Sequence, residues 1–244
     1  MDKQFFYLTG IFRCGNTLLT SILNQNPDLY VTPNSLVPDI LWRTYNLKNE
    51  SLYNEQKDYG SLINVLKNVL PNYYEKRKEK YIIERGPWGT PANYDLLKEI
   101  NMLSKFIILK RPLKEIVASF CKIVKPDSPA GFIDYLLHEE IGPIGKGLLA
   151  YKNLKDTDSK NLLIIEYKDL CKNPNKIIKD IYKFLNIPFY KKHFYNNLKQ
   201  VDENTKQTII RTESVNLKSF EYDRWIPKPY IEILKKYEDT YIYS

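Results

Sequence analysis

Apolar residues gather in short runs along the chain. The clearest runs cover residues 5–9, 106–109 and 162–165, and a weaker one covers 81–83. None alternates strictly between apolar and polar residues, which is typical of strands that helices cover on both faces. The runs therefore predict the buried strands of a parallel sheet.

Amphipathic stretches separate the apolar runs. Residues 17–24 and 112–124 repeat apolar side chains at helical spacing, and residues 177–185 do so up to the helix-stopping Pro188. Pro112 suits the first position of a helix. Strands that alternate with helices favour an α/β fold with a central parallel sheet covered by helices.

Two further segments have weaker patterns. Residues 47–80 are polar with faint helical spacing, which indicates peripheral helices, and residues 200–229 show little periodicity, which indicates a long loop. A chain of 244 residues fits one α/β domain, so we expect a single domain over 1–244.

Charge and cysteine content narrow the choice of ligand. The chain has 37 lysines and arginines against 29 acidic residues, a formal charge of +8 that suits anionic ligands, although solvated surface lysines account for much of it. Its three cysteines lie far apart without metal-ligand spacing, so we expect neither a disulfide scaffold nor a metal site.

The sequence shows no membrane or export signal. It has no apolar stretch of about 18 residues, and no apolar leader precedes the first predicted strand. We therefore expect a cytoplasmic protein without an integral membrane segment.

The sharpest motif is the glycine-rich segment 10–17, GIFRCGNT, between an apolar strand and a helix. Backbone N–H groups and the helix dipole converge on an anion in this context. The segment nearly matches GxxxxGK[ST], but Asn16 replaces the lysine that reaches the outer phosphates of a nucleoside triphosphate. Arg13 and Thr17 remain as a cation and a hydroxyl donor, so the loop predicts a site for a shorter anion; a simple glycine turn is the alternative.

A second strand, cation and helix follow at residues 106–119. Arg111 can grip a phosphate with two parallel hydrogen bonds, and Ser119, eight residues later, adds a neutral donor. In isolation the pair also fits a solvent-exposed arginine and a surface serine. Its position downstream of the glycine-rich loop favours a second anion anchor.

The segment 12–19, FRCGNTLL, resembles the 5′-phosphosulfate loop of sulfotransferases that use 3′-phosphoadenylyl sulfate (PAPS), written PRSGTTLL or PKSGTTWL. The following LNQNPD is similar to the helix end LLxxHPD of that family. The resemblance implies a P-loop NTPase-like fold in which Arg13 contacts the sulfuryl side of PAPS. The residues implied to hold the 5′-phosphate are Cys14, Gly15, Asn16, Thr17 and Leu18, where Cys14 and Asn16 replace the commoner Ser and Thr but keep their backbone donors.

Further resemblances extend toward the C-terminus. Residues 111–119 are similar to the family's 3′-phosphate segment RDPRDVxxS, which implies that Arg111 and Ser119 bind that phosphate. LIIEYKDL looks like the family strand that ends in xRYEDL, which implies that Tyr167 lies against the adenine. Arg224 resembles a lysine that helps to close the cofactor site of tyrosylprotein sulfotransferases, so the 200–229 loop would fold over the nucleotide.

Catalysis of sulfuryl transfer depends on positioning and on charge stabilisation, and Arg13 is the first candidate for that role. Many family members carry a glutamate base shortly after the helix end, where this chain has Asn34 and Ser35. Neither is an ordinary base, so the family's base cannot be carried over to this chain. Asn34 and Ser35, together with Arg85, are predicted to bind substrate.

Glu84 is the best substitute for the base, since IIERGP resembles the family's DKTP or EKTP segment. Arg85 would then stand where the family has a lysine near the transferred group. Glu84 as a simple partner of Arg85 is the alternative, and Asp39 is a weaker candidate base. His138 and His193 lie outside the recognised motifs, which favours structural or solvent-facing roles.

The sequence thus predicts a sulfotransferase that moves the sulfuryl group from PAPS to a hydroxyl or amine and releases PAP. The acceptor, whether sugar, peptide, lipid or small molecule, is not identified. The alternatives are a P-loop nucleotide kinase and a nonenzymatic PAP-binding protein. A nucleic-acid partner is not expected, because no RNP, zinc or helix-turn-helix signature accompanies the positive charge.

Overall fold

Five parallel strands form the centre of the computed structural model, which describes residues 3–33, 35–51, 55, 58–196, 198–202, 207–210, 222 and 225–243. The strand order is β2-β3-β1-β4-β5. The strands are β1 (Gln4–Thr9), β2 (Leu29–Val31), β3 (Tyr81–Arg85), β4 (Phe106–Lys110) and β5 (Leu162–Glu166). This sheet confirms the predicted α/β class, and four of its strands coincide with the apolar runs.

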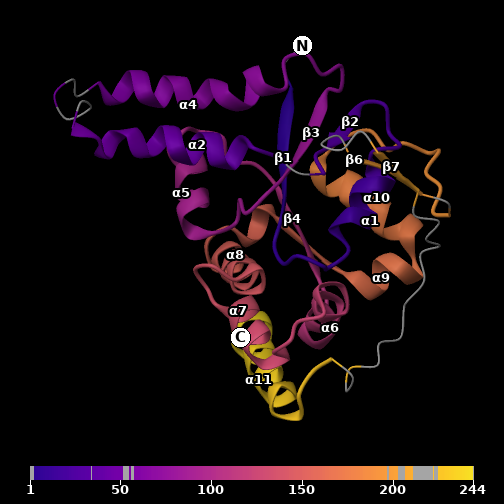
Figure 1. The fold of residues 1–244 in the computed structure, drawn as a ribbon. Coiled ribbons are helices and arrows are strands. Elements are labelled where there is room, and N and C mark those ends of the chain that lie inside the picture. Colours follow the sequence, from indigo (N-terminus) through magenta and orange to yellow (C-terminus); the bar gives the residue numbers. More distant parts are fainter. Residues whose placement is uncertain are drawn as a thin grey trace.

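Helices cover both faces of the sheet (Figure 1). On one side lie α1 (Asn16–Leu23), α9 (Tyr167–Lys172) and α10 (Pro174–Leu185). On the other side lie α2 (Val37–Asn46), α4 (Tyr59–Tyr73) and α5 (Pro91–Glu99), of which α4 falls in the segment expected to form peripheral helices.

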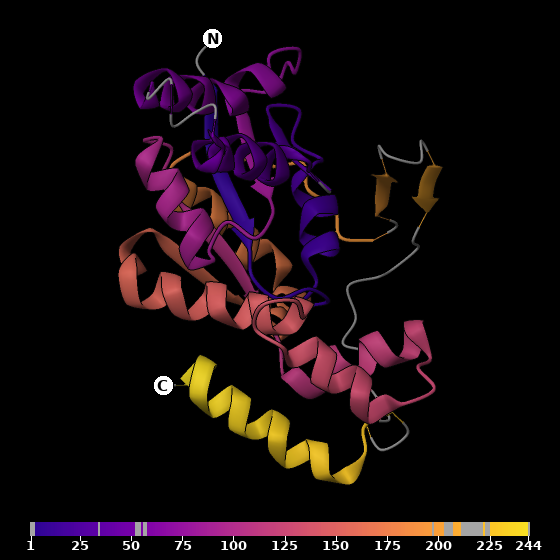
Figure 2. The same cartoon turned by 60° about the vertical axis from the view of Figure 1, so that its left-hand side comes forward.

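A second group of helices gathers beyond the carboxyl ends of the strands. It comprises α6 (Leu113–Val124), α7 (Pro129–Leu137), the start of α8 (Pro143–Thr157) and α11 (Lys228–Glu238), which the short turn η4 (Asp239–Tyr243) directly follows. From this group α8 leads back through η2 (Ser159–Asn161) to the amino end of β5, and η1 (Leu47–Asn49) follows α2. Figure 2 shows α11 running beneath α7 and α8. No helix in the described part of the chain combines the length and apolar character needed to cross a membrane.

Two boundaries differ from the sequence predictions. Pro112 is the residue before α6 and not its first residue, because its ψ of 132° is extended. Within the segment expected to be a loop, β6 (Lys199–Asp202) and β7 (Gln207–Ile210) pair as an antiparallel hairpin that stands apart from the main sheet (Figure 2).

The core forms where the apolar strands meet the helices. Phe106 and Ile107 on β4 and Leu8 on β1 are almost completely buried. Tyr7 is also buried, and its ring packs against Phe106 and Trp88 with centroid separations of 5.1 and 5.2 Å. The Tyr7 hydroxyl donates to the carbonyl of Met102 at 2.7 Å, so burial of this polar group is compensated by a hydrogen bond.

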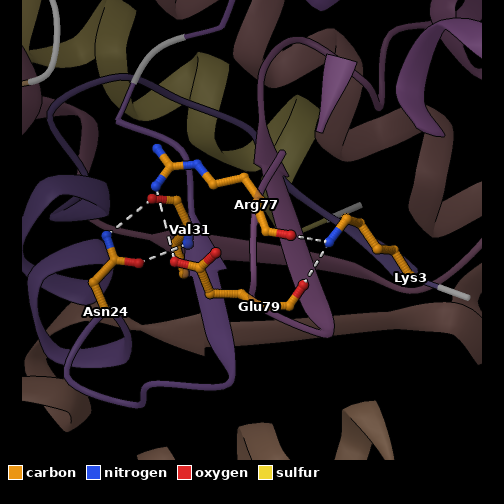
Figure 3. Close-up of polar contacts among 5 residues, drawn as sticks. All are labelled: Lys3, Asn24, Val31, Arg77 and Glu79. Carbon is orange, nitrogen blue, oxygen red and sulfur yellow. Dashed lines mark hydrogen bonds and ion pairs between the residues drawn. The ribbon is translucent and has the colours of Figure 1, made fainter. Parts of the chain in front are cut away.

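The edge strand β2 is held by a side chain. The Asn24 amide accepts from the Val31 N–H at 2.6 Å and donates to the Val31 carbonyl at 2.9 Å (Figure 3). Just before β3 begins, Lys3 donates to the carbonyls of Arg77 and Glu79 (Figure 3). Asn24 thus replaces the neighbouring strand that an edge strand lacks.

Asn24→Ala should destabilise the fold, because it leaves both backbone groups of the buried Val31 without their side-chain partner. We expect a loss of about 1–3 kcal/mol in the free energy of unfolding, measured by urea denaturation. Asn68→Ala is the matched control, since Asn68 is exposed and its amide only donates to a carbonyl of its own helix. Equal stabilities of the two variants would show that Asn24 does not hold β2.

Candidate functional site

The loop between β1 and α1 has a backbone that few side chains tolerate. Gly10, Arg13 and Gly15 have φ values of 105°, 66° and 100°. Asn16 stiffens the loop by donating from its side chain to the Ile11 carbonyl at 3.1 Å. The first N–H groups of α1 have no carbonyl one turn earlier to bond, so the loop and the helix dipole together form a cradle for an anion.

Tyr167 packs directly on the backbone of this loop. A Cβ atom placed on Gly15 would lie 2.5 and 2.6 Å from two ring carbons of Tyr167, far inside van der Waals contact. Tyr167 is the first residue of α9 and follows β5. Position 15 therefore requires glycine twice, for its φ value and for the space that the ring occupies.

Arg111 joins the ends of three strands. It follows β4 and is only 7% exposed. Its guanidinium donates to the Arg13 carbonyl at 3.2 Å, pairs with Glu115 at 2.8 Å, and lies 4.5 Å from the centroid of the Tyr167 ring. Arg13 in turn donates to the Ser119 hydroxyl at 3.2 Å. The structure thus brings together Arg13, Arg111, Ser119 and Tyr167, which the sequence singled out separately.

The C-terminal segment returns to this place. The Lys114 ammonium lies 5.0 Å from the centroid of the Tyr222 ring. The pKa of Tyr222 is raised, first by burial and then by the neighbouring Glu115 carboxylate. Glu238 of α11 accepts from the N–H of Leu113 at the start of α6. The predicted cofactor residue Arg224 and most of its loop lie outside the described residues.

Cys14 and Leu18 support the loop from within. The Cys14 side chain is fully buried, and burial raises the pKa of its thiol to about 12, so the thiol stays protonated at neutral pH. Leu18 is partly buried and packs against the core. Both residues can offer an anion only their backbone N–H groups.

A cavity of about 310 Å³ adjoins the loop. Arg85, at the carboxyl end of β3, is among its lining residues and donates to the Pro33 carbonyl at 3.1 Å. Burial lowers the pKa of Arg85, and the positive charge of Arg13 lowers it further. Arg85 therefore brings positive charge to the cavity wall, within range of the charge on Arg13, which favours binding of an anion there.

Glu84 lies beside Arg85 in the strand but outside the cavity lining. Its carboxylate accepts from the Tyr74 hydroxyl at 2.6 Å and is completely buried. Burial raises the pKa of this carboxyl, while the hydroxyls of Ser35, Tyr74 and Thr32 act in the opposite direction. Ser35 thus faces Glu84.

The remaining candidates lie elsewhere. Asn34 is outside the described residues, and Asp39 is exposed on α2 and does not line the cavity. His138 accepts a hydrogen bond from the N–H of Glu140, and His193 contacts the Tyr182 hydroxyl at 3.0 Å. Across the residues that the structure describes, no three acidic, histidine or cysteine side chains converge as metal ligands would.

The sequence matches the model of the sulfotransferase family over residues 6–191, which is more than half of the chain. The chain belongs to this family. No curated protein matches it.

Solved sulfotransferases have the same fold. A mouse sulfotransferase, SULT7A1, complexed with PAP has a TM-score of 0.59 at 12% identity, over 99% of this chain and 85% of that one. An enzyme from Alicyclobacillus acidocaldarius has a TM-score of 0.53 at 14% identity, over 100% and 96%. The sulfotransferase domain of the Synechococcus PCC 7002 olefin synthase has a TM-score of 0.50 at 20% identity, over 78% and 76%.

Sequence reasoning missed one wall of the cavity in this sulfotransferase. The α8 residues Pro143, Lys146, Gly147 and Ala150 all line the cavity. Their spacing of i, i+3, i+4 and i+7 places them on one face of a helix. That spacing was the available signal, but residues 125–150 carry no recognisable family motif.

Gly15→Ala should destabilise this sulfotransferase by about 1–3 kcal/mol in urea unfolding, because alanine is strained at that φ value and its Cβ meets the Tyr167 ring. The control Gly60→Ala should not destabilise it, since a Cβ there meets only a carboxylate oxygen at 3.9 Å and alanine favours helices. In a Tyr167→Ala background, where the ring is absent, the Gly15→Ala substitution should cost less stability than it does in the wild type. A Gly15→Ala protein as stable as wild type would contradict the packing described.

Proposed function

We propose that this protein transfers the sulfuryl group of PAPS to a hydroxyl or amine acceptor and releases PAP. The observation that carries the proposal is the convergence of Arg13, Arg111, Ser119 and Tyr167 on the loop before α1. Family membership supports sulfuryl transfer. The mouse enzyme of similar fold was solved with PAP, which supports PAPS as the donor.

The residues present fit both anionic ends of PAPS. The backbone donors of residues 14–18 and the α1 N-terminus suit its 5′-phosphate. Arg111 and Ser119 suit the 3′-phosphate, with Arg111 shared between that ligand and Glu115. The Tyr167 ring offers a flat apolar surface for adenine. The part proposed for Arg224, closing the site, stays a prediction.

Arg13 and Arg85 are proposed to stabilise the charge that develops during transfer. When bound, PAPS supplies the electrophilic sulfuryl group. The acceptor oxygen or nitrogen forms a bond to sulfur while the bond from sulfur to the 5′-phosphate oxygen breaks. PAP keeps that electron pair, and the proton of the acceptor passes to a base, for which Glu84 is the candidate, or to water. Hydrogen bonds already hold both guanidinium groups, Arg13 to Ser119 and Arg85 to the Pro33 carbonyl, so their charges need little rearrangement as transfer proceeds.

The proposal also covers the metal requirement of the reaction and the compartment in which the protein acts. We propose that transfer needs no divalent metal, because fixed arginines supply the positive charge that a metal supplies in nucleotide kinases. We also propose action in the cytoplasm, because Cys14, Cys121 and Cys171 are all free thiols, as is usual in a reducing compartment.

Arg111→Ala tests the 3′-phosphate anchor. It should weaken the binding of PAP by about 1.5–3 kcal/mol and that of adenosine 5′-phosphosulfate much less, because only PAP carries a 3′-phosphate. Isothermal titration calorimetry measures both affinities. Arg43→Ala, which removes an exposed arginine of α2, should leave both affinities unchanged. Equal losses for the two ligands in Arg111→Ala would remove Arg111 from the 3′ site.

The base role of Glu84 stays a prediction, and the structure adds a structural role. A base must come within hydrogen-bond reach of the acceptor proton, whereas the Glu84 carboxylate is bonded to Tyr74 away from the cavity lining. The backbone N–H of the next residue, Arg85, donates to the Thr32 hydroxyl at 2.8 Å. Glu84 therefore belongs to the polar cluster that fixes the strand end carrying Arg85.

Glu84→Gln distinguishes the two roles. Because the pKa of Glu84 is raised in the folded protein, its stabilising contribution is present below the unfolded value of about 4.3 and is lost as pH rises through the folded pKa. The stability of Glu84→Gln relative to wild type should therefore increase as pH rises above about 4.3, measured by urea unfolding. A pH-independent difference would contradict the raised pKa.

Turnover of the same variant tests the base. With PAPS and a panel of phenols and aliphatic alcohols, unchanged PAP affinity with lost turnover supports Glu84 as the base, and the loss should be smaller for the more acidic phenols. Near-native turnover of an aliphatic alcohol would leave Glu84 with the structural role alone.

A further inference from the structure

The cavity beside the loop has mostly apolar walls. Phe12, Tyr135 and Ile141 are 48%, 47% and 57% exposed, although they come from three different segments, and all three line this one cavity. Leu8, Pro87 and Ala150 add further apolar surface. Large apolar side chains exposed around one hollow are typical of a ligand site, and the volume lies near the lower end of the range of about 300–1,000 Å³ usual for such sites.

One face of α8 forms a wall of the cavity and packs against the glycine-rich loop. A Cβ placed on Gly147 would lie 2.6 Å from the Ile11 Cα and 2.9 Å from its nitrogen, so the two backbones touch. Lys146 precedes this contact and lines the cavity as well. The contact therefore holds Lys146 near the loop proposed to hold the donor.

The charges that line the cavity are positive. Arg85 and Lys146 both belong to the lining, and none of the described lining residues is acidic. Lys146 has no ion-pair partner among the residues that the structure describes, whereas Lys152, on the same helix, pairs with Asp156 at 2.9 Å. An anionic group on a ligand would give Lys146 the partner that the protein does not supply.

We propose that the acceptor is a small, mostly apolar hydroxyl compound that carries a carboxylate, and that Lys146 selects it by binding the carboxylate. The inference rests on the proposed function, because the glycine-rich loop and Arg85 mark the end of the cavity where the hydroxyl reacts. Apolar walls disfavour a sugar, whose many hydroxyls would lose their hydrogen bonds to water. The two cations disfavour an amine acceptor that binds in its protonated form.

Two phenols that differ in charge test the proposal. The probes are 3-(4-hydroxyphenyl)propanoate and 4-ethylphenol, which share the ring and the reacting hydroxyl. The measured quantity is the ratio of their kcat/KM values with PAPS. Wild type should prefer the carboxylate, and Lys146→Glu should lower the ratio about tenfold or more, because it replaces attraction by repulsion. Lys152→Glu, the matched control with the same change of charge on the same helix but outside the cavity lining, should leave the ratio unchanged.

The result that would overturn the proposal is a wild-type preference for 4-ethylphenol, or a ratio that Lys146→Glu does not change. PAP binding, measured first by calorimetry, separates failure of the acceptor proposal from failure of the proposed function. If PAP does not bind, both proposals are wrong. If PAP binds but neither phenol reacts, saturation-transfer NMR on the PAP-saturated protein replaces turnover. Binding of the carboxylate probe that Lys146→Glu abolishes then supports the proposal, and absence of its binding overturns it.

Discussion

The site depends on the buried guanidinium of Arg111. This one group is bonded to the Arg13 carbonyl and to Glu115 and lies against the Tyr167 ring, so it connects the loop after β1 to the ends of β4 and β5. A buried cation is costly unless hydrogen bonds and a counter-ion compensate it. Glu115 supplies that counter-ion within the protein, and the proposed 3′-phosphate would add a second one.

The order of the strands explains why the other residues meet there. Because β1 lies between β3 and β4, the carboxyl ends of these three parallel strands adjoin. They carry Arg85, the glycine-rich loop and Arg111. Ligands of open parallel sheets bind at the carboxyl ends of the strands. The sheet thus places positive charge on two sides of the loop, with the donor proposed toward Arg111 and the acceptor toward Arg85.

The strands and site residues that have a recognisable local sequence pattern could be predicted. Continuous apolar runs predicted four strands, and motif spacing with the family resemblance singled out Arg13, Arg111, Ser119 and Tyr167, which the fold brings together. The sequence did not predict β2, because a three-residue strand completed by the Asn24 side chain has no periodicity to detect. The burial of Glu84 was equally hidden, since neighbouring strand residues point to opposite faces and sequence does not say which face meets the cavity.

Calorimetric titration of the wild-type protein with PAP, without added metal, tests whether arginines and backbone donors alone hold this ligand. PAP should bind without Mg²⁺, and binding should weaken as salt rises, because these groups hold both phosphates. ADP and ATP, titrated with and without Mg²⁺, should bind more weakly than PAP. Tighter binding of ATP with Mg²⁺ than of PAP would contradict the account and favour a nucleotide kinase.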